Sequence, residues 1–215
     1  RMGLALAAVM ALAAPVSAQA FLEDTTISIG GERHNLDVNA VGTRVSGALN
    51  GAYLRYEVDK DNGFETNTRI FFGKDDGFDY LESSFDVSWK WRDMIGPKLA
   101  YAGLSVDGFG EEYYLAGLTA AHRINNVELR ADLLSDTDNF GDDAYISVGA
   151  EWDATDKLEL GAKFSKITST DLHTAGVTAK YHVNPNIFLE GAFANTEPLS
   201  GVKYNEASVG IGFAF

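Results

Sequence analysis

The last twelve residues of the chain, YNEASVGIGFAF (Tyr204–Phe215), alternate apolar side chains with small or polar ones. The apolar positions are every second residue, namely Ala207, Val209, Ile211, Phe213 and Phe215. Successive side chains of a β-strand point to opposite faces, so this period of two predicts a strand with one apolar face.

The same period recurs along the chain, in the runs 81–91, 127–133, 144–152, 158–164 and 174–183. No comparable 3.6-residue stripe follows residue 20. Earlier strands are expected over 47–58, 64–73, 78–91, 98–107 and 112–122, with one more inside 25–45. The sequence therefore predicts an all-β protein of about 12 strands, with 10 as the alternative, because 98–107 and 112–122 do not separate their two faces.

Short and long connectors alternate between these runs. Tight turns are expected at 124–126, 155–157 and 184–186, and longer acidic or Gly-rich loops at 107–112, 135–143, 169–172 and 198–203. This alternation predicts a sheet with plain turns at one end and exposed loops at the other. The stretch before Val45 is the one segment long enough to fold inward as a constricting loop.

Large aromatic residues gather beside the turns, at Trp89, Trp91, Trp152 and Tyr181, and all four share the parity of the apolar face. Such a belt is typical of the membrane interface. The other face is rich in Gly, Ser, Thr and Ala, which suits a crowded concave interior. A secreted β-sandwich would explain the alternation but not the belt. We expect the apolar face to contact lipid, and a sheet in lipid must close into a barrel.

Composition excludes several classes of protein. The 215 residues are 46% apolar, which is too much for a disordered chain, and the absence of cysteine excludes disulfide frameworks and thiolate metal sites. The net charge of −14 argues against nucleic acid as a partner.

Residues 1–20 differ from the rest. Arg1 precedes an apolar stretch from Leu4 to Ala14, and small residues follow up to Ala20. This pattern predicts a signal peptide that is cleaved after Ala18 or Ala20, and so an exported chain. The apolar run is shorter than the roughly 20 residues of a spanning helix. The domains expected are thus a signal peptide at 1–20 and a barrel at 21–215.

In its C-terminal strand the chain resembles the Gram-negative outer-membrane β-barrel proteins, and its pattern is porin-like. The resemblance implies a closed antiparallel transmembrane β-barrel with short periplasmic turns and longer extracellular loops. It also implies location in the cell outer membrane, with lipid and lipopolysaccharide as surroundings. In that family the terminal strand is the signal read by the outer-membrane assembly machinery, which here implicates Val209, Ile211, Phe213 and Phe215.

No catalytic motif stands out. Some outer-membrane enzymes place a serine two residues after a histidine, but none of the four histidines has one there. His173 with Asp171 is a weak candidate pair, and a triad assembled across strands stays open. The acidic run 136–143 lacks an oxygen ligand at Phe140 and a closing glutamate at Ser147, so it reads as a solvated loop and not as a calcium site. We expect no enzyme activity, no cofactor and no metal.

The polar face carries charges of both signs. By parity the lumen-lining set is Glu82, Asp86, Lys90, Glu128, Arg130, Asp132, Glu151, Glu159, Lys163, Lys180 and Glu190. A dry core could hold them only if every charge were paired. Twelve strands lie between eight, which side chains fill, and sixteen, which leave an aqueous channel.

The leading hypothesis is therefore a narrow water-filled lumen that passes small hydrophilic solutes or ions, with a mild cation preference. The alternatives are a non-conducting structural or surface-interaction barrel and, third, an outer-membrane hydrolase.

Overall fold

The computed structural model of the protein describes residues 24–40, 43–60, 62–75, 78–91, 94–137, 144–168, 172–199 and 202–215. The expected signal peptide and most of the expected connector 135–143, namely 138–143, lie outside the described residues. Within those ranges, no helix is both long and apolar enough to cross a membrane.

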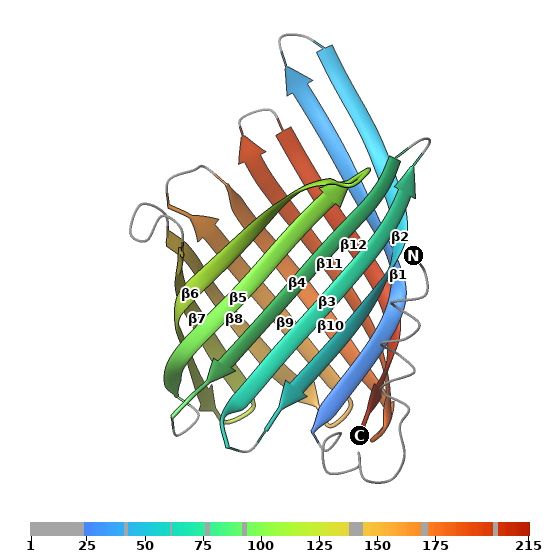
Figure 1. The fold of residues 1–215 in the computed structure, drawn as a ribbon. Coiled ribbons are helices and arrows are strands. Elements are labelled where there is room, and N and C mark those ends of the chain that lie inside the picture. The colour runs from blue at the N-terminus through green and yellow to red at the C-terminus, as the bar shows by residue number, and fades with distance from the viewer. Residues whose placement is uncertain are drawn as a thin grey trace.

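Twelve antiparallel strands form one closed barrel in which each strand pairs with its neighbours in sequence (Figure 1). The strands are β1 (Thr25–Ala40), β2 (Thr43–Asp59), β3 (Phe64–Asp75), β4 (Phe78–Trp89), β5 (Ile95–Val106), β6 (Phe109–Ile124), β7 (Val127–Asp136), β8 (Ala144–Thr155), β9 (Leu158–Ile167), β10 (His173–Asn184), β11 (Ile187–Leu199) and β12 (Val202–Ala214). The all-β class and the closed barrel are confirmed, and twelve strands replace the alternative of ten.

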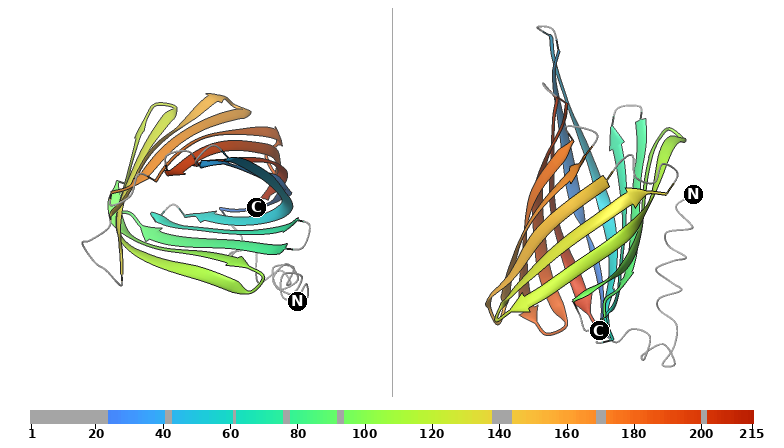
Figure 2. Two further views of the ribbon diagram at one scale, coloured as in Figure 1. Left: turned by 90° about the horizontal axis from the view of Figure 1, so that it is seen from above. Right: turned by 90° about the vertical axis from the view of Figure 1, so that its left-hand side faces the viewer.

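The first and last strands close the barrel. β1 pairs with β12 along its length, for example Ile29 with Ile211 and Gly30 with Gly210. The backbone N–H of Phe215 donates to the carbonyl oxygen of Thr25 at 3.0 Å, and that of Asp24 donates to Phe215 at 3.1 Å. Seen from above, the sheet surrounds an interior (Figure 2). Closure leaves no strand edge unpaired, which is the condition for a sheet in hydrocarbon.

The two ends of the barrel differ. The tight turns after β6, β8 and β10 and the C-terminus lie at one end, called here the turn end (Figure 1). At the other end the strands are staggered, and the hairpin of β1 and β2 projects beyond the rest (Figure 1). In an outer-membrane barrel the turn end faces the periplasm.

Three expected connectors prove to be strand. In the segment 107–112, a two-residue turn at Asp107–Gly108 joins β5 directly to β6. Its φ angles of 51° and 85° are both positive, and two positive φ angles match the twist of the flanking strands of a hairpin. In 198–203, β11 continues to Leu199 and β12 starts at Val202. The stretch before Val45 is β1 and the start of β2 and not an inward loop, since β1 is paired on both sides.

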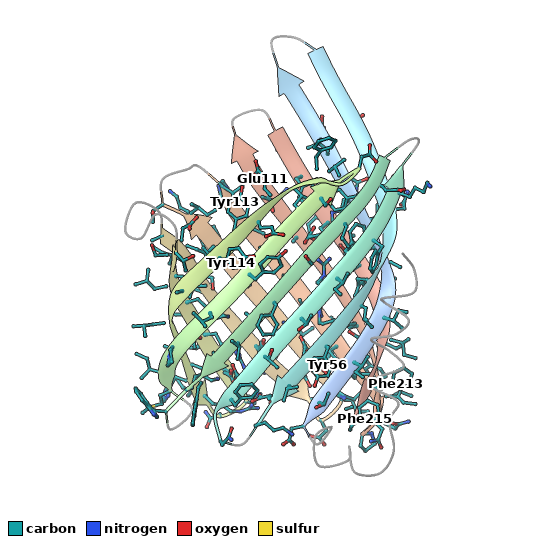
Figure 3. All side chains as sticks on the ribbon, in the orientation of Figure 1. Tyr56, Glu111, Tyr113, Tyr114, Phe213 and Phe215 are labelled. Carbon is teal, nitrogen blue, oxygen red and sulfur yellow. The ribbon has the colours of Figure 1, made fainter. Side chains whose placement is uncertain are left out.

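Burial is reversed relative to a water-soluble protein. Large apolar side chains are exposed all around the wall, whereas Ser28, Glu32, His34, Ser88, Lys90, Thr119, Ser147 and Glu190 are buried. Leaving a large apolar side chain in water forgoes about 1.5–3 kcal/mol, and more than twenty such side chains are exposed here. Figure 3 shows these side chains pointing away from the wall, with Phe213 and Phe215 low on the outside. The outer face therefore requires an apolar medium.

Candidate functional site

The barrel interior is crossed by ion pairs. Arg130 on β7 and Glu65 on β3 belong to strands separated by three others, so a contact between them must run through the interior. Nη1 of Arg130 lies 3.1 Å from Oε2 of Glu65, and Nη2 lies 3.4 Å from Oε1. These two opposite walls are therefore braced directly against each other.

Glu65 sits at the centre of one such group, the Glu65 cluster, made of Glu65, Lys90, Glu128 and Arg130. The ammonium of Lys90 also donates to Glu65, and Glu128 lies 2.5 Å from Nε of Arg130. Lys90 is almost completely buried. Two carboxylates and two cations balance one another here, so the cluster is neutral.

A second group, the Arg69 cluster, is made of Glu32, His34, Arg69, Glu82 and Glu206. The guanidinium of Arg69 on β3 binds Glu32, Glu82 at 3.0 Å and Glu206 at 3.1 Å. Its three carboxylate partners come from β1, β4 and β12, so one cation draws four strands together. Three acids around one arginine leave an excess of negative charge.

His34 completes this group. One ring nitrogen contacts Glu32, the other contacts the hydroxyl of Tyr204, and the ring stacks on buried Phe71 with centroids 4.3 Å apart. Glu32, His34 and Glu206 bring potential metal-ligating atoms within 4.8 Å of one another. Arg69 already binds both carboxylates and supplies the positive charge that such a cluster requires. The arrangement is that of an ion-pair network.

A third group, the Lys98 cluster, lies on β4, β5 and β7. Lys98 is 3.4 Å from Asp86 and 3.3 Å from Asp132, and the hydroxyl of Ser147 donates to Asp132 at 2.9 Å. Two acids share one lysine. Like the Arg69 cluster, this group carries net negative charge.

Tyr53 and Arg55 on β2 reach Glu190 on β11, across the two strands between them. The phenol of Tyr53 donates to Oε1 of Glu190 at 2.6 Å, and Nη1 of Arg55 lies 3.4 Å from Oε2. Arg55 also lies 4.0 Å from Glu57. This contact spans the closure between the two ends of the chain.

The wall of β8 to β12 is lined differently. Its inner positions alternate with the exposed apolar ones and are mostly small, including Gly149, Gly161, Gly176, Thr178, Ala192, Ala194 and Ser208. A Cβ added to Gly149 or Gly176 would meet its nearest neighbour at 3.2 or 3.4 Å, so no bulky side chain covers either position. Most charges of the clusters thus stand on β1 to β7, whereas small side chains occupy most inner positions of β8 to β12.

Lys163 projects from this small-residue wall, paired across the sheet with Gly149 and Gly176. It acts electrostatically on Asp86 and Asp132 of the Lys98 cluster, which places its ammonium toward the interior. Among the described residues, none lies within ion-pair distance of it. Lys163 is a cation on the small-residue wall.

The predicted lumen-lining residues take the following places. Glu82 binds Arg69, Asp86 and Asp132 bind Lys98, and Lys90, Glu128 and Arg130 join Glu65. Glu159 pairs with Lys180 at 3.8 Å and with His182 at 2.7 Å. Glu190 binds Tyr53 and Arg55, whereas Glu151 and Lys163 stand on the small-residue wall.

The sequence interpretation missed half of the network, namely Glu32, Arg55, Glu57, Glu65, Arg69, Lys98 and Glu206. Glu65, Arg69 and Lys98 alternate with apolar or threonine neighbours, so strict parity carried through β3 and β5 would have found them. Glu32 and Glu206 lie beside glycine and serine residues, so the sequence there does not show which face is apolar.

The predicted interface aromatics lie on the outside near the turn end. Trp89, Trp91, Trp152 and Tyr181 are all exposed, and Trp91 is the most exposed of the four. The indole N–H of Trp89 donates to the carbonyl oxygen of Asn62 in a turn at 3.2 Å. The C-terminal residues Val209, Ile211, Phe213 and Phe215 are exposed on the outer face of β12 and just beyond it. Their role as an assembly signal stays a prediction.

The candidate pair of His173 and Asp171 lies partly outside the described residues. His173 is 3.9 Å from Glu197. His34 contacts the carboxylate of Glu32 through one ring nitrogen and the hydroxyl of Tyr204 through the other. The expectation that the protein is not an enzyme stays a prediction.

No family model matches the chain, and no curated protein matches it. Solved structures share its fold. The KdgM porin in complex with disordered oligogalacturonate aligns with 87% of this chain and 99% of its own, at 12% identity and a TM-score of 0.59. The NanC porin aligns with 88% of this chain and 100% of its own, at 10% identity and a TM-score of 0.57.

The translocator domain of the autotransporter NalP from Neisseria meningitidis covers 98% of this chain and 96% of its own, at 9% identity and a TM-score of 0.57. At these identities the likeness concerns the fold. The chain has the barrel architecture found in porins and in an autotransporter translocator.

Proposed function

We propose that the protein is a porin-like barrel of the outer membrane that lets small hydrophilic solutes or ions diffuse through its interior, with a preference for cations. The path runs along the small-residue wall of β8 to β12. The charge clusters of β1 to β7 form the opposite side of the path. The exposed apolar belt and the porin-like fold support the location in a membrane.

The observation that carries the proposal is the imbalance of charge in the interior. The three clusters and the contacts of Arg55 involve nine carboxylates, Glu32, Glu57, Glu65, Glu82, Asp86, Glu128, Asp132, Glu190 and Glu206, and five cations, Arg55, Arg69, Lys90, Lys98 and Arg130. Uncompensated buried charge is costly without water. Water in the interior would solvate the excess carboxylates and so lower this cost. The negative potential of these carboxylates would attract cations.

The acid excess also points to a different solute from that of the KdgM structure, which holds oligogalacturonate. A polyanionic sugar would meet repulsion from the Arg69 and Lys98 clusters. Small cations and neutral hydrophilic molecules would not. We therefore place polyanions last among the solutes of this barrel.

Planar-bilayer recording of the purified protein tests the proposal. We expect stepwise conductance and, in a KCl gradient, a reversal potential of the sign for cation preference. Raising the salt concentration should weaken the preference, because mobile ions screen the fixed charges. Absence of conductance steps, or anion preference, would overturn the proposal.

A non-conducting structural barrel is the second candidate, and two sets of contacts favour it. Arg130 binds Glu65 across the interior, and Arg69 on β3 binds three acids on β1, β4 and β12. If these braces seal the barrel, the wild type is silent and neutral replacements on both sides of a brace create conductance. If the path beside β8 to β12 is open, the wild type already conducts.

A further inference from the structure

A groove of about 360 Å³ lies on the outer face of the barrel, along β3 and between β2 and β4. Pairing across the three strands explains its shape. Thr68 stands between Tyr56 and Phe85, and in the next outward row Thr66 stands between Val58 and Val87. Two small side chains flanked on both sides by larger ones make a channel that follows the strand.

The floor of the groove is apolar in effect. The hydroxyl of Thr66 donates to the backbone carbonyl oxygen of Asp86 at 2.9 Å, so its hydrogen-bonding capacity is used within the sheet. Its methyl group is left to face the groove. Tyr56 appears low on the front of the barrel in Figure 3, on the same wall. A straight hydrocarbon chain suits this surface better than a polar ligand.

The groove ends at the level of the aromatic belt. Phe64 lies at its lower end and is paired with Trp89, whose indole N–H binds the turn at Asn62. Lys60 lines the same end, and its ammonium lies 3.9 Å from a carboxylate oxygen of Asp24. The lysine is positively charged and lies at headgroup level, and the groove beside it is apolar. This arrangement is complementary to a phospholipid, in which a negatively charged phosphate is joined to an acyl chain.

We propose that this groove binds one glycerophospholipid of the periplasmic leaflet, with an acyl chain along Thr66 and Thr68 and its phosphate at Lys60. The turn end faces the periplasm in barrels of this architecture, which selects phospholipid over lipopolysaccharide. The inference rests on the membrane location within the proposed function. It does not depend on conduction through the interior.

Native mass spectrometry of the detergent-purified full chain tests it, with palmitoyl-oleoyl phosphatidylglycerol and phosphatidylethanolamine added after delipidation. We expect one phospholipid per chain. Thr68→Leu fills the floor and should remove the bound state. Lys60→Gln loses an ion pair worth about 1 kcal/mol and should weaken binding roughly fivefold.

Matched controls lie elsewhere on the barrel. Ala162→Leu fills a small outward position on β9, and Lys157→Gln removes an exposed lysine from a turn at the same end. Both should bind lipid like the wild type. Equal binding by Thr68→Leu and Ala162→Leu would overturn the inference.

Two other outcomes would also overturn it. Purified lipid A could displace the phospholipid from the wild type and itself bind the wild type but not Thr68→Leu, which would make lipopolysaccharide the occupant. Dimers lost in Thr68→Leu would make a second copy of the chain the occupant. Conductance of the same samples separates this inference from the proposed function, since a silent barrel that binds phospholipid refutes only the pore.

Discussion

Tyr53 on β2 and Glu190 on β11 are joined by a 2.6 Å hydrogen bond that passes over the closure of the barrel. The phenol ring fits there because β1 and β12 present Gly30 and Gly210 beneath it. A Cβ on Gly30 would lie 2.6 Å from Cε1 of Tyr53, and one on Gly210 would lie 2.1 Å from its hydroxyl. Two glycines thus make room for the ring that seals the first strand to the last.

Gly210→Ala should therefore destabilise the barrel. The added methyl group displaces Tyr53 and leaves Glu190 with only its longer contact to Arg55, at a cost of about 2–3 kcal/mol in the free energy of unfolding. Urea unfolding in lipid vesicles measures this. Gly191→Ala is the control, since its Cβ would meet its nearest neighbour at an ordinary 3.6 Å. Equal stability of the two variants would show that the ring does not depend on the glycine.

Glu65 contacts both Lys90 and Arg130 in the interior. Glu65→Gln removes the ion-pair partner of buried Lys90, leaves Arg130 with Glu128, and should lower the free energy of unfolding by about 2–4 kcal/mol. Asp79→Asn breaks the exposed pair with Lys74 and should change it by less than about 1 kcal/mol. The same vesicle unfolding compares both. A smaller effect for Glu65→Gln than for Asp79→Asn would contradict the brace.

Much of this fold can be predicted from the sequence because alternation is a local property. Strands from Leu81 onward have one clearly apolar and one polar face, so parity predicts which side chains share a face, as it does for Asp132 and Glu190. The exposed Trp152 and Tyr181 follow from the same parity. The prediction weakened in β1 and β5, where glycine, proline and alanine make the faces similar.

The pairing of charges could not be predicted in the same way. Which residues meet across the interior depends on the tilt and stagger of the strands, and these are properties of the closed barrel. Arg130 and Glu65 are 65 positions apart, and no local pattern links them. The expected loops at 107–112 and 198–203 are longer than the observed ones, because polar residues at their edges belong to strands that extend beyond the apolar belt.

Lys163 provides a test of the path through the interior. Lys163→Gln removes a cation from the small-residue wall and should increase cation preference, changing the permeability ratio roughly two- to fivefold. Lys166→Gln is the control on the same strand, because Lys166 faces outward. Reversal potentials in a KCl gradient give the ratio. An identical shift in both variants would mean that surface charge, and not the interior, sets selectivity.

The C-terminal phenylalanine separates folding stability from assembly. The side chain of Phe215 is 56% exposed, while its backbone holds the chain end through Thr25 and Asp24. Phe215→Ala should therefore lower the unfolding free energy of the refolded barrel by no more than Phe193→Ala does, since each removes one outward phenylalanine and the backbone hydrogen bonds of the chain end remain. If the assembly machinery recognises this residue, the amount of folded barrel recovered from cell membranes should fall several-fold.

Phe193→Ala, which removes an outward phenylalanine from β11 but keeps the chain end, is the matched control. Equal recovery of the two variants would refute a role for the terminal side chain as a signal, and a large loss of stability in Phe215→Ala would make it a structural residue instead.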